Sequence, residues 1–192
     1  MEHGCGYAPY FFYERMDIVN NVTPFSSEDK LVAELSESLA LACGLSTDSA
    51  KLIGDAAALH DVGKNFICKS ILNKPEKLTP DEYSIMKTHT IWGVKILSKL
   101  QGELRIVAMN VSALHHEKWD GTGYWNRKGD DIPYYCQIVS MCDIYVAVTS
   151  SNRPYKEPWS STKALEYIKS ESGKTFCPNL TDTFQTLFSQ VA

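Results

Sequence analysis

The sequence has no long apolar run and no excess of basic residues. A helix that crosses a bilayer needs about 20 consecutive apolar residues, so no membrane-spanning segment is expected. The first residues also lack the basic and then apolar layout of a signal peptide. The 19 lysines and arginines against 23 acidic residues give a net charge of −4, which argues against binding to a nucleic acid polymer or an anionic membrane. We therefore expect a cytoplasmic protein that binds any phosphate group through local side chains.

Paired cysteines and low-complexity segments are also absent. Most of the thiols have apolar neighbours and none forms a Cys-x-x-Cys pair, as is typical of reduced, buried cysteines, so no disulfide framework is expected. The six cysteines are Cys5, Cys43, Cys68, Cys136, Cys142 and Cys177. With only 11 glycines and 8 prolines in 192 residues, and 44% hydrophobic residues, the composition predicts one globular domain with a core.

Period-two alternation of apolar residues is too short anywhere to predict a sheet, whereas apolar spacings of three and four recur along the chain. The sequence therefore predicts an all-α domain. The expected helices cover residues 31–42, 47–60, a stretch that begins at Pro80 and carries His89, 104–114, a stretch after Pro133, 161–172 and 178–191. The aromatic-rich N-terminal segment, residues 1–25, is expected to contribute to the first helix, and the main domain is expected to span 26–192.

One carboxylate, Asp143, lies in an apolar run that predicts a buried helix. Because burying an unpaired charge costs roughly several kcal/mol, Asp143 needs a partner that compensates its charge. Candidate partners near the ends of other predicted helices are His60, Asp61, His89, His115 and His116. A single buried histidine is more often a core residue, so the prediction rests on the whole set. A mixed set of imidazoles and carboxylates suits Fe, Mn or Zn, and two ions bridged by Asp61 would explain the number of ligands.

Several ordered blocks carry a resemblance to a known family. They are His60-Asp-Val-Gly-Lys64, Ile71-Leu-Asn-Lys-Pro75, His115-His-Glu-Lys-Trp-Asp-Gly-Thr-Gly-Tyr124 and Arg153-Pro-Tyr-Lys156, together with His89 and Asp143. This set resembles the HD-GYP branch of the HD-domain phosphohydrolases. The resemblance implies a bundle of about seven helices around a metal site. It also implies hydrolysis of the second messenger cyclic di-GMP to linear pGpG and then GMP.

The resemblance also assigns roles to individual residues. The implied metal ligands are His60, Asp61, His89, His115, His116 and Asp143. Asp61 and Lys64 are the implied catalytic residues, and the implied substrate-binding residues are Lys64, Gly123, Tyr124, Arg153 and Lys156. The expected cofactors are two divalent ions, Fe or Mn, with Zn, Ni or Mg as alternatives. The expected partners are a cyclic dinucleotide, a GGDEF-domain protein and a second copy of the chain. Trp119 is a further candidate, beside Tyr124, for stacking on guanine.

Two departures from the family pattern concern the metals. About 32 residues before His60, where the family has a metal-binding histidine, this chain has Glu28. A carboxylate can replace an imidazole on a borderline metal, so Glu28 is expected to be a ligand, in preference to Asp29. The acidic residue that helps to hold a third metal in some members is replaced by Pro24, which predicts two metals rather than three.

The other departures concern the loop and the core. Trp125 stands where the family has proline, Val146 where it has aspartate, and Phe176-Cys-Pro178 where it has Phe-Asp-Pro. These changes leave two alternatives open. The domain can bind a cyclic dinucleotide or a signalling partner without turnover, or it can act on another nucleotide such as cyclic GMP-AMP. A di-iron oxygenase is a weaker alternative, because Lys64, Arg153 and Lys156 favour a phosphate-bearing substrate.

Overall fold

The structure is a computed structural model that describes residues 26–151 and 157–189, and within these ranges it contains helices and no β-strand. The all-α prediction is confirmed. The elements are α1 (Ser27–Ala42), α2 (Thr47–Ala57), the 3-10 helix η3 (Val62–Phe66), α3 (Lys69–Leu72), α4 (Pro80–Lys87), α5 (His89–Leu97), α6 (Gly102–Leu114), the 3-10 helix η4 (Gly129–Asp131), α7 (Tyr134–Thr149), α8 (Ser161–Ser170) and α9 (Pro178–Ser189).

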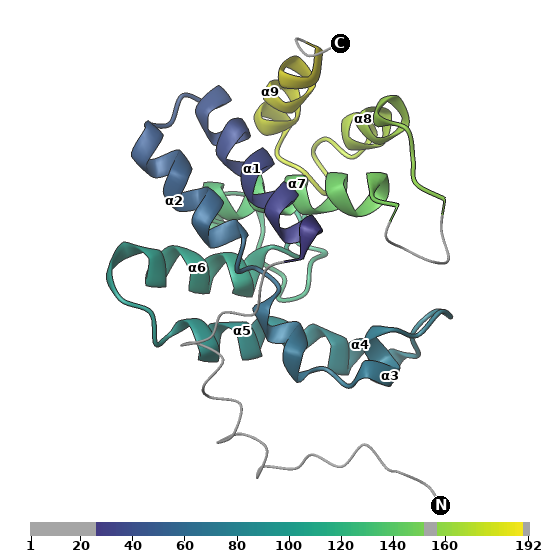
Figure 1. Cartoon of the computed structure of the whole chain (residues 1–192). Coiled ribbons are helices and arrows are strands. Elements are labelled where there is room, and N and C mark those ends of the chain that lie inside the picture. Colours follow the sequence, from purple (N-terminus) through teal and green to yellow (C-terminus); the bar gives the residue numbers. More distant parts are fainter. Residues whose placement is uncertain (1–25, 152–156, 190–192) are drawn as a thin grey trace, which may run out of the picture.

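Helix α7 forms the centre of the core. It packs against α1, α6 and α8, while α1 packs against α2 and α9, and α5 lies beside α6 below them (Figure 1). Its apolar side chains point in several directions, as the sequence predicted, and Ile138, Val139, Met141 and Cys142 are completely buried. Val146, where the family has aspartate, belongs to the same core. A helix buried on nearly all sides gives Asp143 a fixed position in the middle of the molecule.

Several helices begin or end at the capping residues that the sequence predicts. The Thr79 hydroxyl accepts a hydrogen bond from the Glu82 N–H (3.3 Å), and the Glu82 carboxylate accepts one from the Thr79 N–H (2.7 Å), which completes the predicted capping box of α4. The Ser46 hydroxyl caps α2 by accepting a hydrogen bond from the Ser49 N–H (3.2 Å). Gly44 follows α1 with φ +83°, as expected for a helix that ends in a left-handed residue.

The predicted helix that begins at Pro80 ends earlier than expected. It stops at Lys87, and His89 begins the separate helix α5, which the sequence did not predict. Side chains form hydrogen bonds with the backbone carbonyl groups at the end of α4. The Thr88 hydroxyl donates to the Ile85 carbonyl (2.6 Å) and the Thr90 hydroxyl donates to the Lys87 carbonyl (2.9 Å). The His89 ring contacts the Met86 carbonyl. Within the described ranges, this break and the four-residue helix α3 raise the number of α-helices above the expected number of about seven.

Some predictions concern residues outside the described ranges. The N-terminal segment, residues 1–25, including Pro24, lies outside them, and so do Arg153 and Lys156. The five cysteines that the structure describes are all free, as predicted. Among the described residues no helix combines the length and the apolar character needed to cross a membrane. Phe176 and Cys177 of the 176–178 block are buried in the core.

Candidate metal centre

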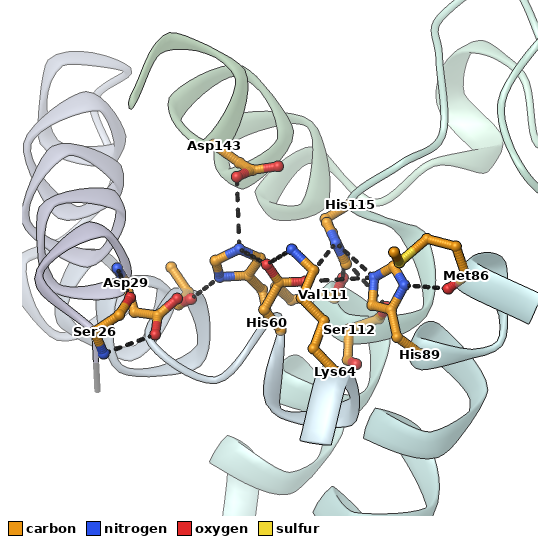
Figure 2. Close-up of polar contacts among 12 residues, drawn as sticks. Ser26, Asp29, His60, Lys64, Met86, His89, Val111, Ser112, His115 and Asp143 are labelled. Carbon is orange, nitrogen blue, oxygen red and sulfur yellow. Dashed lines mark hydrogen bonds and ion pairs between the residues drawn. The ribbon is translucent and has the colours of Figure 1, made fainter. Parts of the chain in front are cut away.

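Helix ends bring the predicted ligands together. His60 and Asp61 lie between α2 and η3, His89 is the first residue of α5, and His115 caps the end of α6. Asp143 points toward His60 from α7, on the opposite side (Figure 2). Residues from four parts of the chain therefore meet in one place, between the central helix α7 and the lower helices α5 and α6.

Asp61 is at the middle of this cluster. Its Oδ2 lies 3.2 Å from His60 Nε2, and its Oδ1 lies 3.4 Å from His89 Nε2 and 3.6 Å from His115 Nε2. The half-buried Lys64 ammonium pairs with the same carboxylate. His60 Nε2 is also 3.6 Å from Asp143 Oδ1, so Asp143 has the partner that its position required. Side-chain atoms that could bind a metal form three overlapping donor sets, and within each set these atoms lie within 4.8 Å of one another. The sets are Asp61 with His89, His115 and His116; His60 with His115 and Asp143; and Asp29 with His60 and Asp61.

The histidine rings are oriented by backbone carbonyl groups. In each of three rings the Nδ1 atom lies within hydrogen-bond distance of a backbone carbonyl three or four residues earlier. These contacts join His60 to Ala57 (2.7 Å), His89 to Met86 (2.7 Å) and His115 to Val111 (3.0 Å). In the neutral ring, a proton on Nδ1 that donates to the carbonyl leaves the Nε2 lone pair directed at Asp61, which is the usual arrangement of a metal-binding histidine.

One buried oxygen atom makes the cluster suited to a cation. Among the described residues, Asp61 Oδ1 is buried and has no hydrogen-bond partner, although two imidazole nitrogens lie within 3.6 Å of it. An ionised oxygen in such a position is costly unless a positive charge compensates it. A divalent ion bound by Asp61, His89, His115 and His116 would satisfy both the carboxylate and the imidazole lone pairs, and this donor set suits Fe, Mn or Zn.

Burial keeps two of these imidazoles neutral. It lowers the pKa of His89 to about 4, against the opposing effect of Asp61. Burial and the neighbouring His115 hold the pKa of His116 well below its usual value. Only a neutral imidazole can bind a metal, so both rings are in the form that ligation requires at neutral pH.

On the side of the cluster that contains His60 and Asp143, neighbouring opposite charges determine the direction of the pKa shifts. Burial works against the charge on His60, but Asp61 and Asp143 outweigh it and raise its pKa well above the usual value. Burial also opposes the ionisation of Asp61, yet His60 and Lys64 keep its pKa well below its usual range. The pKa of Asp143 is lowered for the same reason, with His60 as the compensating group. Both carboxylates are therefore ionised and available to a cation.

The structure separates the two acidic residues at the start of α1. Asp29 has a carboxylate oxygen within 4.8 Å of donor atoms of His60 and Asp61, and Figure 2 shows it beside His60. Glu28 is in none of the donor sets, and its carboxylate accepts a hydrogen bond from Ser150 instead. Glu28, the ligand expected from its distance to His60 in the sequence, therefore points away from the cluster. Its neighbour Asp29 faces the cluster.

The glycine-rich loop after α6 places an aromatic ring beside the histidines. The centroid of the Tyr124 ring lies 4.5 Å from that of His116 and 6.3 Å from that of His89. Gly123 makes this possible, because a Cβ there would lie 2.5 Å from the Cα of Glu117. Its observed role is thus to let two backbone segments approach closely. Trp119 packs against the core, and its backbone N–H donates to the Thr175 carbonyl (3.1 Å).

Other residues near the site were missed from the sequence. Glu117 is 3% exposed, and its carboxylate accepts hydrogen bonds from the N–H groups of Trp125 (2.7 Å) and Arg127 (2.6 Å), which fixes the loop. Tyr83 of α4 packs edge-to-face on Tyr124, with ring centroids 5.7 Å apart. Nothing in the local sequence around Tyr83 distinguishes it from an ordinary exposed residue, because its position depends on a loop 40 residues later.

Comparison with known proteins agrees with this geometry. A family model described as the HD domain matches residues 14–180. The chain is 43% identical over 152 residues to 3'3'-cGAMP-specific phosphodiesterase 2 of Vibrio cholerae, covering 79% of this chain and 29% of that protein. It is 41% identical over 140 residues to the cyclic di-GMP phosphodiesterase response regulator RpfG of Xanthomonas campestris, covering 72% and 37%. A cyclic di-GMP phosphodiesterase of Thermotoga maritima is 35% identical over 187 residues, with 94% and 50% covered.

These curated relatives are longer proteins, of which the chain spans half or less. Solved structures share the fold at lower identity. Bd1817 of Bdellovibrio bacteriovorus, described as an HDG"Y"P protein, superposes with a TM-score of 0.68 at 15% identity and covers 94% of this chain and 60% of its own. The HD domain of the phosphodiesterase PgpH of L. monocytogenes, in complex with cyclic di-AMP, gives a TM-score of 0.61 at 18% identity, with 91% and 94% covered. The chain therefore belongs to the HD-domain family, and within it to the HD-GYP branch.

Proposed function

We propose that this chain is a metal-dependent phosphodiesterase that hydrolyses cyclic di-GMP to linear pGpG and then to GMP. The observation that carries the proposal is the buried, unpartnered Asp61 Oδ1 facing two imidazole nitrogens, with the Lys64 ammonium on the same carboxylate. Phosphodiester hydrolysis needs both a cation site and further positive charge for the phosphoryl oxygens. The names of several relatives as cyclic di-GMP phosphodiesterases support this substrate class.

The residues divide into two groups in this mechanism. The first group would hold two divalent ions and comprises His60, Asp61, His89, His115, His116 and Asp143. When bound, such ions supply hydroxide at neutral pH and neutralise the charge on the phosphoryl group. Lys64, one turn beyond His60, then binds a phosphoryl oxygen, and Arg153 and Lys156 are proposed to bind the remaining phosphate charge. A charged donor that strengthens its contact as charge develops lowers the barrier.

A second substrate has specific support. The relative with 43% identity is named as a 3'3'-cGAMP-specific phosphodiesterase, and this chain carries Trp125 where the family has proline. The phosphodiester groups and sugars of the two messengers are the same, so the metal centre alone does not separate them. The choice must come from contacts with the bases. Cyclic GMP-AMP is therefore the alternative substrate to be compared directly.

The full chain, purified without oxygen and loaded with Fe(II) or Mn(II), is expected to convert cyclic di-GMP to pGpG. Lys64→Ala is expected to retain both metals but to lose about 10²-fold in turnover, because one charged donor to the phosphoryl group is removed. Chromatographic separation of products after incubation with each cyclic dinucleotide measures the activity. Elemental analysis of the same samples measures the metal content.

Lys51→Ala provides a matched control, because Lys51 pairs with Asp55 at an exposed place on α2 and contacts none of the ligands. It should leave turnover unchanged. Intact substrate with a fully metallated wild-type protein would identify a binding domain without turnover. Loss of metal together with activity in Lys64→Ala would instead show that the lysine serves only to neutralise Asp61.

We further propose that Asp29 contributes to metal binding. Its carboxylate accepts a hydrogen bond from the Ser26 N–H (2.9 Å) in the capping box of α1 and also reaches the donor set of His60 and Asp61. Asp29→Asn keeps the size and most of the capping geometry but weakens ligation. Metal affinity on the His60 side should fall about 10- to 100-fold, as measured by titration with Mn(II).

Glu28→Gln is the matched control for this prediction, since Glu28 bonds to Ser150 and lies outside the donor sets. It should leave metal affinity unchanged. Loss of metal in Glu28→Gln but not in Asp29→Asn would restore Glu28, the residue predicted from the sequence, as the ligand. Elemental analysis of anaerobic protein also identifies the metals, for which Fe and Mn are proposed and Zn, Ni and Mg are the alternatives. A GGDEF-domain partner, a homodimer and a cytoplasmic location stay predictions.

A further inference from the structure

A chain of aromatic rings leads outward from the metal centre. It starts at His116, whose ring centroid lies 4.5 Å from that of Tyr124, and continues to Tyr83, whose ring stands edge-to-face on Tyr124 at 5.7 Å. Tyr83 is 46% exposed. One ring, that of Tyr124, therefore separates the histidines from an aromatic surface that faces solvent.

A second exposed ring and a cation complete this surface. Trp125 is 41% exposed, and the Lys87 ammonium lies 5.8 Å from the centroid of Tyr83 and 5.9 Å from that of Trp125. Tyr83 and Lys87 are four residues apart, so they lie on the same side of α4, which is next to α5 and its His89 (Figure 1). We call Tyr83, Lys87 and Trp125 the aromatic shelf.

Hydrogen bonds and close backbone packing hold the loop that carries Trp125. The buried Glu117 carboxylate binds the backbone N–H groups of Trp125 and Arg127, and Gly123 is in close contact with the backbone of residues 116–118. These contacts fix the backbone from which the Trp125 ring projects. Rigid aromatic side chains lose little conformational entropy on binding, which favours recognition of a flat ligand.

We propose that the aromatic shelf binds a purine base of the nucleotide whose phosphate is held at the metal centre; this inference rests on the proposed function. Tyr83 and Trp125 offer ring faces for stacking, and the ammonium of Lys87 between them donates hydrogen bonds. Guanine presents two acceptors on one edge, N7 and O6, whereas adenine presents N7 beside an amino donor. The shelf therefore favours guanine. Trp125 extends it at the position where the family has proline.

The test uses equilibrium binding of GMP, AMP and inorganic phosphate to the full chain loaded with Mn(II). Tyr83→Ala and Trp125→Ala should each weaken GMP binding about 5- to 150-fold, the range seen when a stacking ring is removed. Inorganic phosphate affinity and metal content should not change, because the metal ligands are untouched. Lys87→Met should weaken GMP more than AMP and so reduce the ratio of the two affinities.

Tyr134→Ala is the matched control, since Tyr134 is a tyrosine of α7 with 39% exposure that contacts Cys43 rather than the shelf. It should bind GMP as the wild type does. Unchanged GMP affinity in both shelf variants, or an equal loss of phosphate affinity, would overturn the inference. If the wild type binds GMP through the shelf but leaves cyclic di-GMP intact, the proposed function fails while the base site stands.

Discussion

Asp61→Ala is expected to remove both the metals and the activity. Asp61 is common to two of the three donor sets and contacts His60, His89 and His115 within 3.6 Å, so no other carboxylate can take its place. Metal affinity should fall by more than about 100-fold, because even changes behind a ligand cost 10- to 100-fold. Turnover of cyclic di-GMP should fall by at least about 10³-fold. Titration with Mn(II) and product chromatography measure the two effects.

Two further variants make this result interpretable. Asp61→Asn keeps the shape of the side chain and removes its charge, so it should also lose metal even where Asp61→Ala proves unstable. Asp55→Ala removes an exposed carboxylate six residues earlier, whose solvent-screened pairing with Lys51 contributes little to stability. That protein should keep its metals and turnover. A metallated, active Asp61→Asn protein would exclude Asp61 as the shared ligand.

The sequence was sufficient to predict that candidate ligands on helix ends come together. An apolar stripe on α2 leads to His60, and the nearly all-round apolar helix α7 carries one carboxylate, so both side chains were expected inside the molecule. The structure joins them, with His60 Nε2 3.6 Å from Asp143 Oδ1. This succeeds because burial and the cost of an unpaired charge are properties of residue type and spacing.

The sequence does not determine positions that depend on the rotation of a helix or on a distant segment. Adjacent residues of an α-helix point about 100° apart, so the choice between Glu28 and Asp29 depends on how α1 is turned against α2, which residue counting does not measure. The end of α4 depends on side chains that capture its last carbonyl groups. Trp125 and Tyr83 meet Lys87 only after the loop following α6 has folded back over α4.

Gly63→Ala is expected to damage both the stability and the metal centre. A Cβ at Gly63 would lie 1.9 Å from the carbonyl oxygen of His89 and 2.6 Å from the backbone nitrogen of Gly93. Backbone atoms cannot rotate away, so η3 must move from α5. Overpacking of this kind costs about 1–3 kcal/mol in the free energy of unfolding, which lowers Tm by about 2–12 °C for a chain of this size. Thermal unfolding of the metal-free protein measures this cost.

Displacement of η3 also separates the two halves of the metal centre, because Asp61 lies directly before η3 and His89 begins α5. Metal affinity should therefore fall at least about 10-fold. Gly44→Ala separates the two effects: with φ +83° and open space around it, alanine there costs about 1–2 kcal/mol of backbone strain far from the ligands. It should lower Tm and leave metal affinity unchanged. Equal metal affinity in both variants would mean that the contact between η3 and α5 stabilises the fold without positioning Asp61 and His89.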